Sequence, residues 1–214
     1  MDKGLFISFE GVEGSGKSTQ REYLTQYIRS LGYEVVCTRE PGGTQIGQVL
    51  RDLILDPAVR CGHPLTELLL FYADRLEHVA NVVEPALMAG KVVICDRYID
   101  STYAYQVGGR GMSEQVVAQL SEWVNVMPDM TILLDLDPNE GLRRARQRAE
   151  LDRFEQEEMA FHERVREQYL LRAANEPDRI SLIDVAHQSE SAVFELVKAA
   201  LDQRLSVGMG EGLT

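Results

Sequence analysis

The stretch FEGVEGSGKST, residues 9–19, ends an apolar run that begins at Leu5 and leads into a segment with helical spacing. Residues 11–18 match the pattern GxxxxGK[ST] in the strand-then-helix context that this pattern requires. Glycines at these positions let successive backbone N–H groups point into one concavity, and the following helix adds its positive end. The stretch therefore predicts a loop that binds the phosphates of a nucleoside triphosphate through Gly11, Val12, Glu13, Gly14, Ser15, Gly16, Lys17, Ser18 and Thr19.

Outward from this loop, short apolar runs alternate with helical patterns. Strands are expected over 5–10, 33–38, 91–96, 130–137 and 179–185, and helices over 17–31, 64–90 and 189–204. Pro85 should kink or interrupt the long helix, because proline has no N–H to donate. This alternation predicts an α/β fold of the P-loop NTPase type, in which helices cover both faces of a five-stranded parallel sheet.

No repeat or linker divides the 214 residues, so we expect a single domain over 1–205 with a short helical lid over about 138–153. The glycine-rich residues 206–214 are expected to form a disordered tail. The net charge of −12 argues against nucleic-acid or membrane partners. The three cysteines form no CxxC pair, and the N-terminus lacks a signal-peptide pattern, so a cytoplasmic location is expected.

Acidic residues close two of the expected strands and are candidates for binding Mg²⁺ together with the Ser18 hydroxyl. Asp96 follows the apolar run VVIC, which is the Walker-B arrangement, and Asp135 and Asp137 compete for this role. A carboxylate that caps the next helix is the alternative, especially for Asp137, which precedes Pro138. We favour Asp96, because Arg97 follows it directly and the same strand end then supplies a carboxylate and a guanidinium.

Several classes of P-loop protein fit this sequence poorly. A GTPase switch would carry NKxD and DxxG motifs, and neither is present. A DNA motor would be expected to have a basic face, whereas this chain is acidic. A kinase that acts on a small molecule fits better, and its reaction needs positive charge around the transferred phosphoryl group.

Arginines supply candidates for that charge. Arg39 ends the second expected strand, and Arg75 lies in the long helix, where a surface ion pair with Asp74 or Glu77 is the alternative. The segment 143–153 holds five further arginines, which indicate a lid that closes over phosphates. The alternative is a solvated helix with pairs such as Glu140–Arg144 and Arg146–Glu150. Lys17 is expected to reach the β- and γ-phosphates.

The sequence resembles the bacterial thymidylate kinase family over nearly its whole length. The matching segments are FEGVEGSGKSTQ, TREPGGT, FYADR, DRYxxSTYAYQ and the arginine-rich ELDRFE. The resemblance implies a nucleoside-monophosphate-kinase fold, transfer of a phosphoryl group from ATP to dTMP with Mg²⁺, and a homodimer. The loop interior holds no arginine, as in the family type whose lid arginines provide the transition-state charge, and Arg148 and Arg153 are the leading candidates.

The resemblance also implies residue roles in binding the acceptor. Arg97 and Arg39 would hold the 5′-phosphate of dTMP, and Phe71 would stack on thymine, although periodicity alone would make Phe71 a core aromatic. Arg75 and Gln106 would bond the edge of the base, with Tyr105 beneath the sugar. Ser101 belongs to the same run as Tyr105, and Glu40 to the TREPGGT segment. The four histidines match no role.

Overall fold

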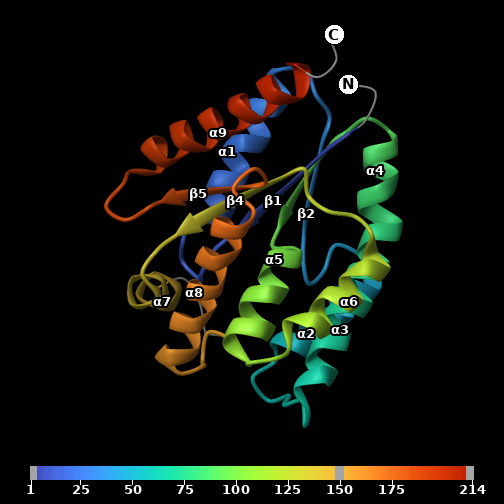
Figure 1. Ribbon diagram of the computed structural model, residues 1–214, viewed down its shortest axis with the longest axis vertical. Coiled ribbons are helices and arrows are strands. Elements are labelled where there is room, and N and C mark those ends of the chain that lie inside the picture. The colour runs from blue at the N-terminus through green and yellow to red at the C-terminus, as the bar shows by residue number, and fades with distance from the viewer. Residues whose placement is uncertain (1–3, 148–151, 211–214) are drawn as a thin grey trace.

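The computed structural model describes residues 4–147 and 152–210. Its centre is a parallel sheet of five strands in the order β2-β3-β1-β4-β5 (Figure 1). The strands are β1 (Leu5–Glu10), β2 (Val35–Arg39), β3 (Val92–Asp96), β4 (Met130–Asp135) and β5 (Ile180–Asp184). The predicted fold class is confirmed, and each strand lies within one residue of its expected run except at the start of β2 and the end of β4.

Helices and helical turns connect the strands. They are α1 (Lys17–Ser30), α2 (Gln45–Leu55), α3 (Pro64–His78), η1 (Val79–Val83), α4 (Glu84–Met88), α5 (Ile99–Thr102), η2 (Tyr103–Gly109), α6 (Glu114–Val124), α7 (Pro138–Arg146), α8 (Met159–Asn175) and α9 (Glu190–Gly210). No helix in the described ranges is long and apolar enough to span a bilayer.

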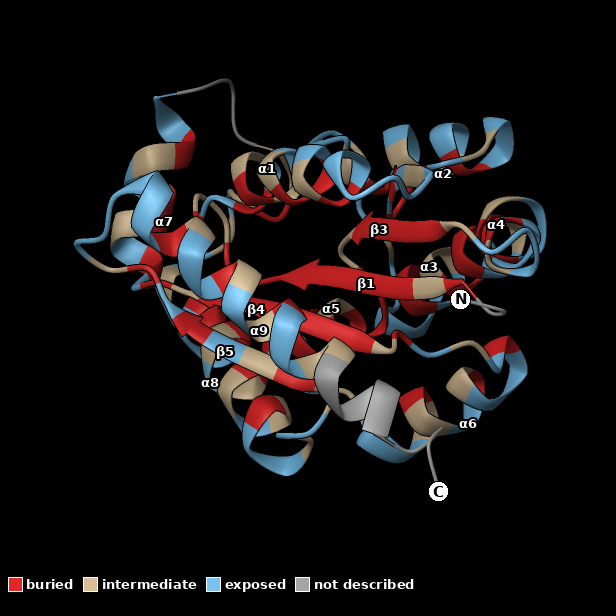
Figure 2. Ribbon diagram, turned by 90° about the horizontal axis from the view of Figure 1, so that it is seen from above, coloured by how far each residue is buried: buried red, intermediate tan, exposed pale blue. Residues whose placement is uncertain are grey.

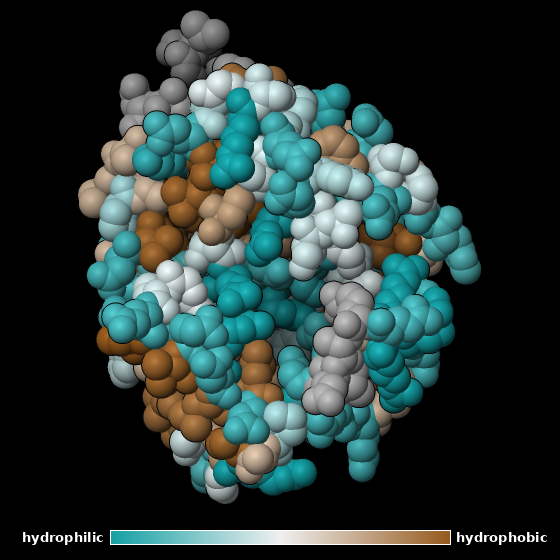
Figure 3. All heavy atoms as spheres, turned by 180° about the vertical axis from the view of Figure 1, so that it is seen from behind, coloured by the Kyte–Doolittle hydropathy of each residue, from teal (hydrophilic) through white to brown (hydrophobic). Residues whose placement is uncertain are grey.

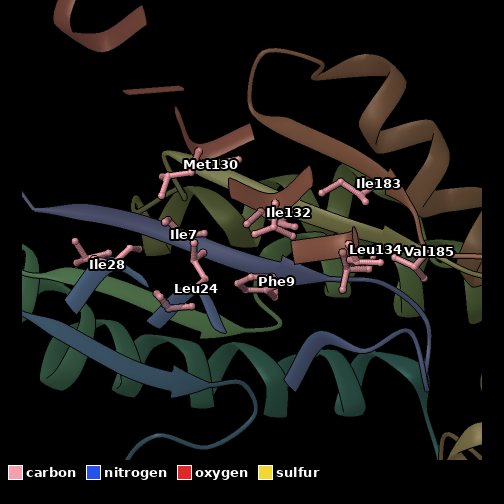
Figure 4. Close-up of a cluster of buried hydrophobic side chains, with 14 of the residues drawn as sticks. Ile7, Phe9, Leu24, Ile28, Met130, Ile132, Leu134, Ile183 and Val185 are labelled. Atoms are coloured by element: carbon pink, nitrogen blue, oxygen red, sulfur yellow. The ribbon is translucent and has the colours of Figure 1, made fainter. Parts of the chain in front are cut away.

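Both faces of the sheet are buried, as parallel sheets require. Ile7 and Phe9 of β1 pack with Leu24 of α1 and Val197 of α9 on one face (Figure 4). Alternate side chains such as Phe6 point to the other face, where α3, α4, α5 and α6 cover β1 and β3. There α8 packs against η2 and β4, and Figure 2 shows the buried strands between these two helical layers.

The register of the strands decides which loops meet. Phe9 pairs with Asp96, and Asp96 also pairs with Arg39, so β1, β3 and β2 end at the same level. The segments after these three strands are therefore brought together at one edge of the sheet, as in other open α/β folds.

One expected helix differs from the structure, and two further expected segments, the tail and the lid, are described only in part. The helix expected over 64–90 ends as an α-helix at His78, and a π-helical turn, Val79–Val83, precedes α4. Pro85 cannot donate to the carbonyl four residues earlier, which explains an interruption there. At the C-terminus, α9 runs to Gly210, and residues 211–214 lie outside the described ranges, so the disordered tail expected over 206–214 stays a prediction. In the expected lid, α7 covers 138–146.

Candidate active site

The loop between β1 and α1 forms a tight cradle. Gly14 has a φ of 68°, and a Cβ there would lie 2.2 Å from the carbonyl oxygen of Gly141 in α7. Glycine is thus required both by the left-handed backbone and by the close approach of α7. Lys17 Nζ donates to the carbonyls of Gly11 and Val12, at 2.9 Å each, and Ser15 Oγ is buried without a partner among the described residues.

The loop lines the larger of two adjoining cavities, of about 570 Å³. Figure 3 shows a hydrophilic hollow on this side of the molecule. The lining includes most of the predicted phosphate loop, namely Glu13, Gly14, Ser15, Gly16, Lys17, Ser18 and Thr19, together with Arg39, Glu40, Arg51, Asp96, Arg97 and Arg144. Basic side chains from four different segments therefore face the same space as the loop, an arrangement suited to a polyphosphate.

The charge of Lys17 responds to this setting. Burial, and then the positive charge of Arg97, lower the pKa of Lys17 to about 8, against the opposing effect of Glu13. A phosphate placed in the cavity adds negative charge near the ammonium and raises the pKa again. The protonated form of Lys17 is therefore favoured more strongly when the cavity holds an anion than when it does not.

The three acidic candidates for metal binding separate clearly. Asp96 lines the larger cavity and lies 3.5 Å from Arg21. Asp135 accepts two hydrogen bonds from Arg166, at 2.7 and 2.8 Å, and Asp137 caps α7 by accepting the backbone N–H of Asn139. Asp135 and Asp137 therefore have structural partners, and Asp96 is the one of the three that faces the cavity.

The smaller cavity, of about 110 Å³, adjoins the larger one. Five residues line both cavities and so form the boundary between them: Glu13, Glu40, Arg51, Arg97 and Asp152. The smaller cavity is also lined by Phe71, Arg75, Ser101, Tyr105 and Gln106, which all belong to the predicted acceptor set. Arg39 lines the larger cavity and is absent from the lining of the smaller one. A two-substrate transfer reaction requires two such sites in contact.

Arg97 is held rigidly at this boundary. Its φ of 66° is in the left-handed region, which costs energy for a residue with a side chain and is found most often at functional sites. Its guanidinium donates to the Gly11 carbonyl, to Ser101 and to Tyr169, and it forms an ion pair with Glu13. The residue is oriented by four groups from three segments, the phosphate loop, α5 and α8, as a phosphate-positioning arginine needs to be.

A buried carboxylate lies behind Arg97. Glu10, at the end of β1, accepts hydrogen bonds from the Tyr98 N–H, the Ser101 hydroxyl and the Tyr169 hydroxyl. Burial, and then the charge of Asp100, raise the pKa of Glu10 to about 7. Glu10 thereby links the strand end to α5 and α8 and supports the partners of Arg97.

Aromatic and amide side chains line the smaller cavity from α3 and η2. Phe71 is half-buried and packs against Phe154, with ring centroids 6.0 Å apart. The wide π-helical turn of η2 directs two consecutive side chains, Tyr105 and Gln106, to this cavity, and such turns are frequent at functional sites. Tyr105 donates its hydroxyl proton to Glu13, which ties the phosphate loop to the smaller cavity.

Arg75 has a partner that the sequence alternatives did not include. It is 2% exposed, and its Nε donates to Glu40 at 2.7 Å, while His78 Nδ1 lies 2.8 Å from the other oxygen of Glu40. Arg75 Nη1 is buried without a partner in the described part of the chain. A buried guanidinium N–H with no acceptor, beside a cavity, is suited to a carbonyl group of a ligand. His78, to which we assigned no role, thus supports the cavity through Glu40.

The lid arginines fall into different places. Arg143 and Arg144 both pair with Glu140, as the solvated-helix alternative expected for Arg144, yet Arg144 also lines the larger cavity. Arg153 lines neither of the two adjoining cavities: it donates to the Ile54 carbonyl and to Glu67, both at 2.7 Å. Arg148 and Glu150 lie outside the described ranges, so the prediction for Arg148 and the alternative pair Arg146–Glu150 stay predictions.

Arg51 is a site residue that sequence reasoning missed. It lies in α2, lines both cavities, and donates to the Pro41 carbonyl at 2.8 Å. Burial, and then repulsion from Arg39, lower its pKa, as expected where several cations face one space. Its position 12 residues after Arg39, on a helix that follows the TREPGGT segment, was the available signal.

Comparisons with known proteins agree on one family. The family model described as "Thymidylate kinase" matches residues 9–196. The chain is 50% identical over 200 residues to a thymidylate kinase from Pseudomonas entomophila, which covers 92% of this chain and 95% of that protein. It is 48% identical over 209 residues to one from Pseudomonas fluorescens, covering 97% and 99% of the two chains. The crystal structure of thymidylate kinase from Ehrlichia chaffeensis is similar with a TM-score of 0.76 and 36% identity, over 93% of this chain and 98% of that one.

Proposed function

This chain belongs to the thymidylate kinase family, and on that premise we propose that it transfers the γ-phosphoryl group of ATP to dTMP, giving dTDP and ADP for dTTP synthesis. The observation that carries the proposal is the pair of adjoining cavities with Arg97 and Arg51 at their boundary. ATP phosphates in the larger cavity and the monophosphate of dTMP at the boundary would bring donor and acceptor together. Positioning and positive charge are the main requirements of phosphoryl transfer.

Each cavity supplies groups that suit one substrate. The phosphate loop, from Gly11 to Thr19, would bind ATP. In the smaller cavity, Phe71 offers an aromatic face to thymine, while Arg75 and Gln106 offer hydrogen bonds to the edge of the base. Arg97 and Arg39 would hold the 5′-phosphate, with Arg51 as a further candidate. Ser101, Tyr105 and Glu40 complete the proposed acceptor site.

Mg²⁺ fits the residues at the larger cavity. The Ser18 hydroxyl and the Asp96 carboxylate both line it, and Mg²⁺ usually takes one or two protein oxygens together with substrate phosphates and water. When bound, the ion would neutralise phosphate charge and orient the β- and γ-phosphates. Asp96 would hold it from the end of β3, directly before Arg97.

The proposed transition-state donors are Lys17, Arg97 and the arginines of the lid. We retain Arg148 and Arg153 as lid candidates and add Arg144, which already lines the larger cavity. Arg153 would have to leave Glu67 to act there, so it serves this role only through a movement of the lid.

A homodimer is proposed through α2 and α3. Ile46, Val49 and Leu53 are exposed at helical spacing on α2, and Leu65 and Leu69 are exposed on the adjacent α3. Figure 3 shows apolar residues gathered at its lower left, in the part of the molecule that these helices form. Val49→Glu should convert a dimer into monomers in sedimentation experiments. A wild-type protein that sediments as a monomer contradicts the proposal.

The activity is tested by a coupled ADP-release assay with ATP, Mg²⁺ and a panel of acceptors: dTMP, dUMP, dCMP, dGMP and AMP. We expect dTMP to have the highest kcat/KM, and Lys17→Ala to serve as an inactive control that stays folded. Slow hydrolysis that is independent of any acceptor would indicate a nucleotide switch instead. A higher kcat/KM with another monophosphate would contradict the assignment of dTMP.

A further inference from the structure

Glu67 is a buried carboxylate that lies outside the two adjoining cavities but contacts a residue that lines one of them. It lies in the first turn of α3, is 3% exposed, and lines neither of the two adjoining cavities. An acceptor bound in the smaller cavity therefore does not reach it. Any effect of Glu67 on the acceptor must pass through the side chains that it contacts.

Three side chains converge on this carboxylate. Gln106 Nε2 lies 3.0 Å from Oε1, Arg153 Nη1 lies 2.7 Å from Oε2, and Arg110 Nε lies 3.3 Å from Oε1. Burial acts to raise the pKa of Glu67, but the hydrogen bond from Gln106 and the charges of Arg110 and Arg153 outweigh it and lower the pKa. Glu67 is thus ionised at neutral pH.

An ionised carboxylate accepts hydrogen bonds and cannot donate one, whereas a primary amide has a donor end and an acceptor end. Gln106 must therefore turn its NH₂ group toward Glu67. Its side chain is 1% exposed and yet lines the smaller cavity. Within residues 4–147 and 152–210, the hydrogen bond of the Gln106 side chain runs from Nε2 to Glu67, and none reaches its Oε1. The amide oxygen is thereby left for a ligand.

A donor lies in the same cavity. Arg75 also lines it, and its buried Nη1 has no partner among the described residues. Thymine and uracil present an N–H at ring position 3 beside a carbonyl at position 4. Cytosine presents a ring nitrogen lone pair beside an amino group, which reverses both hydrogen bonds. An amide oxygen and a guanidinium N–H complement the first pattern and oppose the second.

We propose that Glu67 is a positioning residue for base selection, which fixes the amide of Gln106 with its oxygen available to the acceptor and so favours thymine or uracil over cytosine. The proposal rests on the proposed function, because it concerns the acceptor site of that reaction. Arg110 and Arg153 contribute by keeping Glu67 charged, so that the amide has one orientation of low energy instead of two.

The test is Glu67→Gln, in which a neutral amide can present either end to Gln106. We expect the ratio of kcat/KM for dTMP over dCMP to fall at least about tenfold, mainly through a higher KM for dTMP. The ratio for dTMP over dUMP should stay within about twofold of wild type, because both bases present the same N–H and carbonyl. A merely structural disturbance of the cavity would change both ratios.

Two variants control the experiment. Glu157→Gln removes another carboxylate that pairs with Arg110 but has no hydrogen bond to Gln106, and it should leave both ratios unchanged. Glu67→Asp keeps an acceptor-only group and should retain the dTMP-over-dCMP ratio even where thermal stability falls, which keeps the test valid if Glu67→Gln folds poorly.

Two results would overturn the inference: an unchanged dTMP-over-dCMP ratio in folded Glu67→Gln, or loss of that ratio in folded Glu67→Asp. A wild-type enzyme that does not prefer dTMP over dCMP would instead contradict the proposed function. The wild-type measurement therefore tests the proposed function, and the variant measurements test the role of Glu67.

Discussion

Gly141 of α7 should be essential for activity although nothing in its own backbone conformation requires glycine. A Cβ at this position would lie 2.2 Å from the carbonyl oxygen of Glu13 in the phosphate loop, and real Cβ contacts essentially never fall below 3.0 Å. Gly141→Ala must therefore separate α7 from the loop by about 1 Å. Displacements of about 1 Å in a catalytic arrangement can cost about 10²-fold in rate.

Stability should change much less than activity in this variant. Alanine in a helix gains roughly 0.5–1 kcal/mol over glycine, which offsets part of the steric cost. We expect kcat to fall about 100-fold at saturating ATP and dTMP, with a thermal midpoint within a few degrees of wild type. Gly62→Ala is the matched control, because a Cβ there meets nothing within 4 Å.

A folded Gly141→Ala enzyme that keeps kcat within about threefold of wild type would refute the reasoning. It would mean that the loop and α7 can separate without moving the phosphates. An equally large loss of activity in Gly62→Ala would show that the effect is not specific to the contact with Glu13.

Two further predictions concern charge. Arg144→Ala should lower kcat more than it raises the KM for dTMP, because Arg144 lines the larger cavity. Arg143 is more exposed and has the same partner, Glu140, so Arg143→Ala is the control and should change neither parameter beyond about twofold. Equal effects of the two substitutions would contradict a role for Arg144 at the larger cavity. Burial, and then the charge of Glu40, raise the pKa of Asp74 from 3.8 to about 7. The protonated Asp74 side chain therefore stabilises the folded state fully below about pH 4, and this stabilisation is lost as pH rises through 7. From pH 5 to 7 this loss is about 2.7 kcal/mol at ~1.4 kcal/mol per pH unit, and Asp74→Asn should reduce the difference in urea unfolding free energy between pH 5 and pH 8 by up to that amount. An unchanged difference in the variant would contradict the assignment.

Local sequence signals were sufficient for the framework of this protein. The phosphate loop was predictable because glycine spacing, Lys17 and the strand-to-helix context all lie within about 15 residues. The five strands were predictable because parallel strands that are buried on both faces read as short apolar runs. The choice of Asp96 over Asp135 and Asp137 for Mg²⁺ stays a prediction, although the structure gives Asp135 and Asp137 partners outside the cavity that Asp96 lines.

Side-chain partnerships across long sequence separations were decided by the tertiary structure. Arg75 pairs with Glu40, 35 residues away, and not with Asp74 or Glu77, because α3 turns that face toward the end of β2. Arg153 lies 86 residues from Glu67 and meets it through the packing of the segment after α7 against α3. A sequence pattern reports which groups are available and how they are spaced along one element. The partner of a buried charge depends on which elements the core brings into contact, because burial without a partner costs several kcal/mol and the fold must supply one.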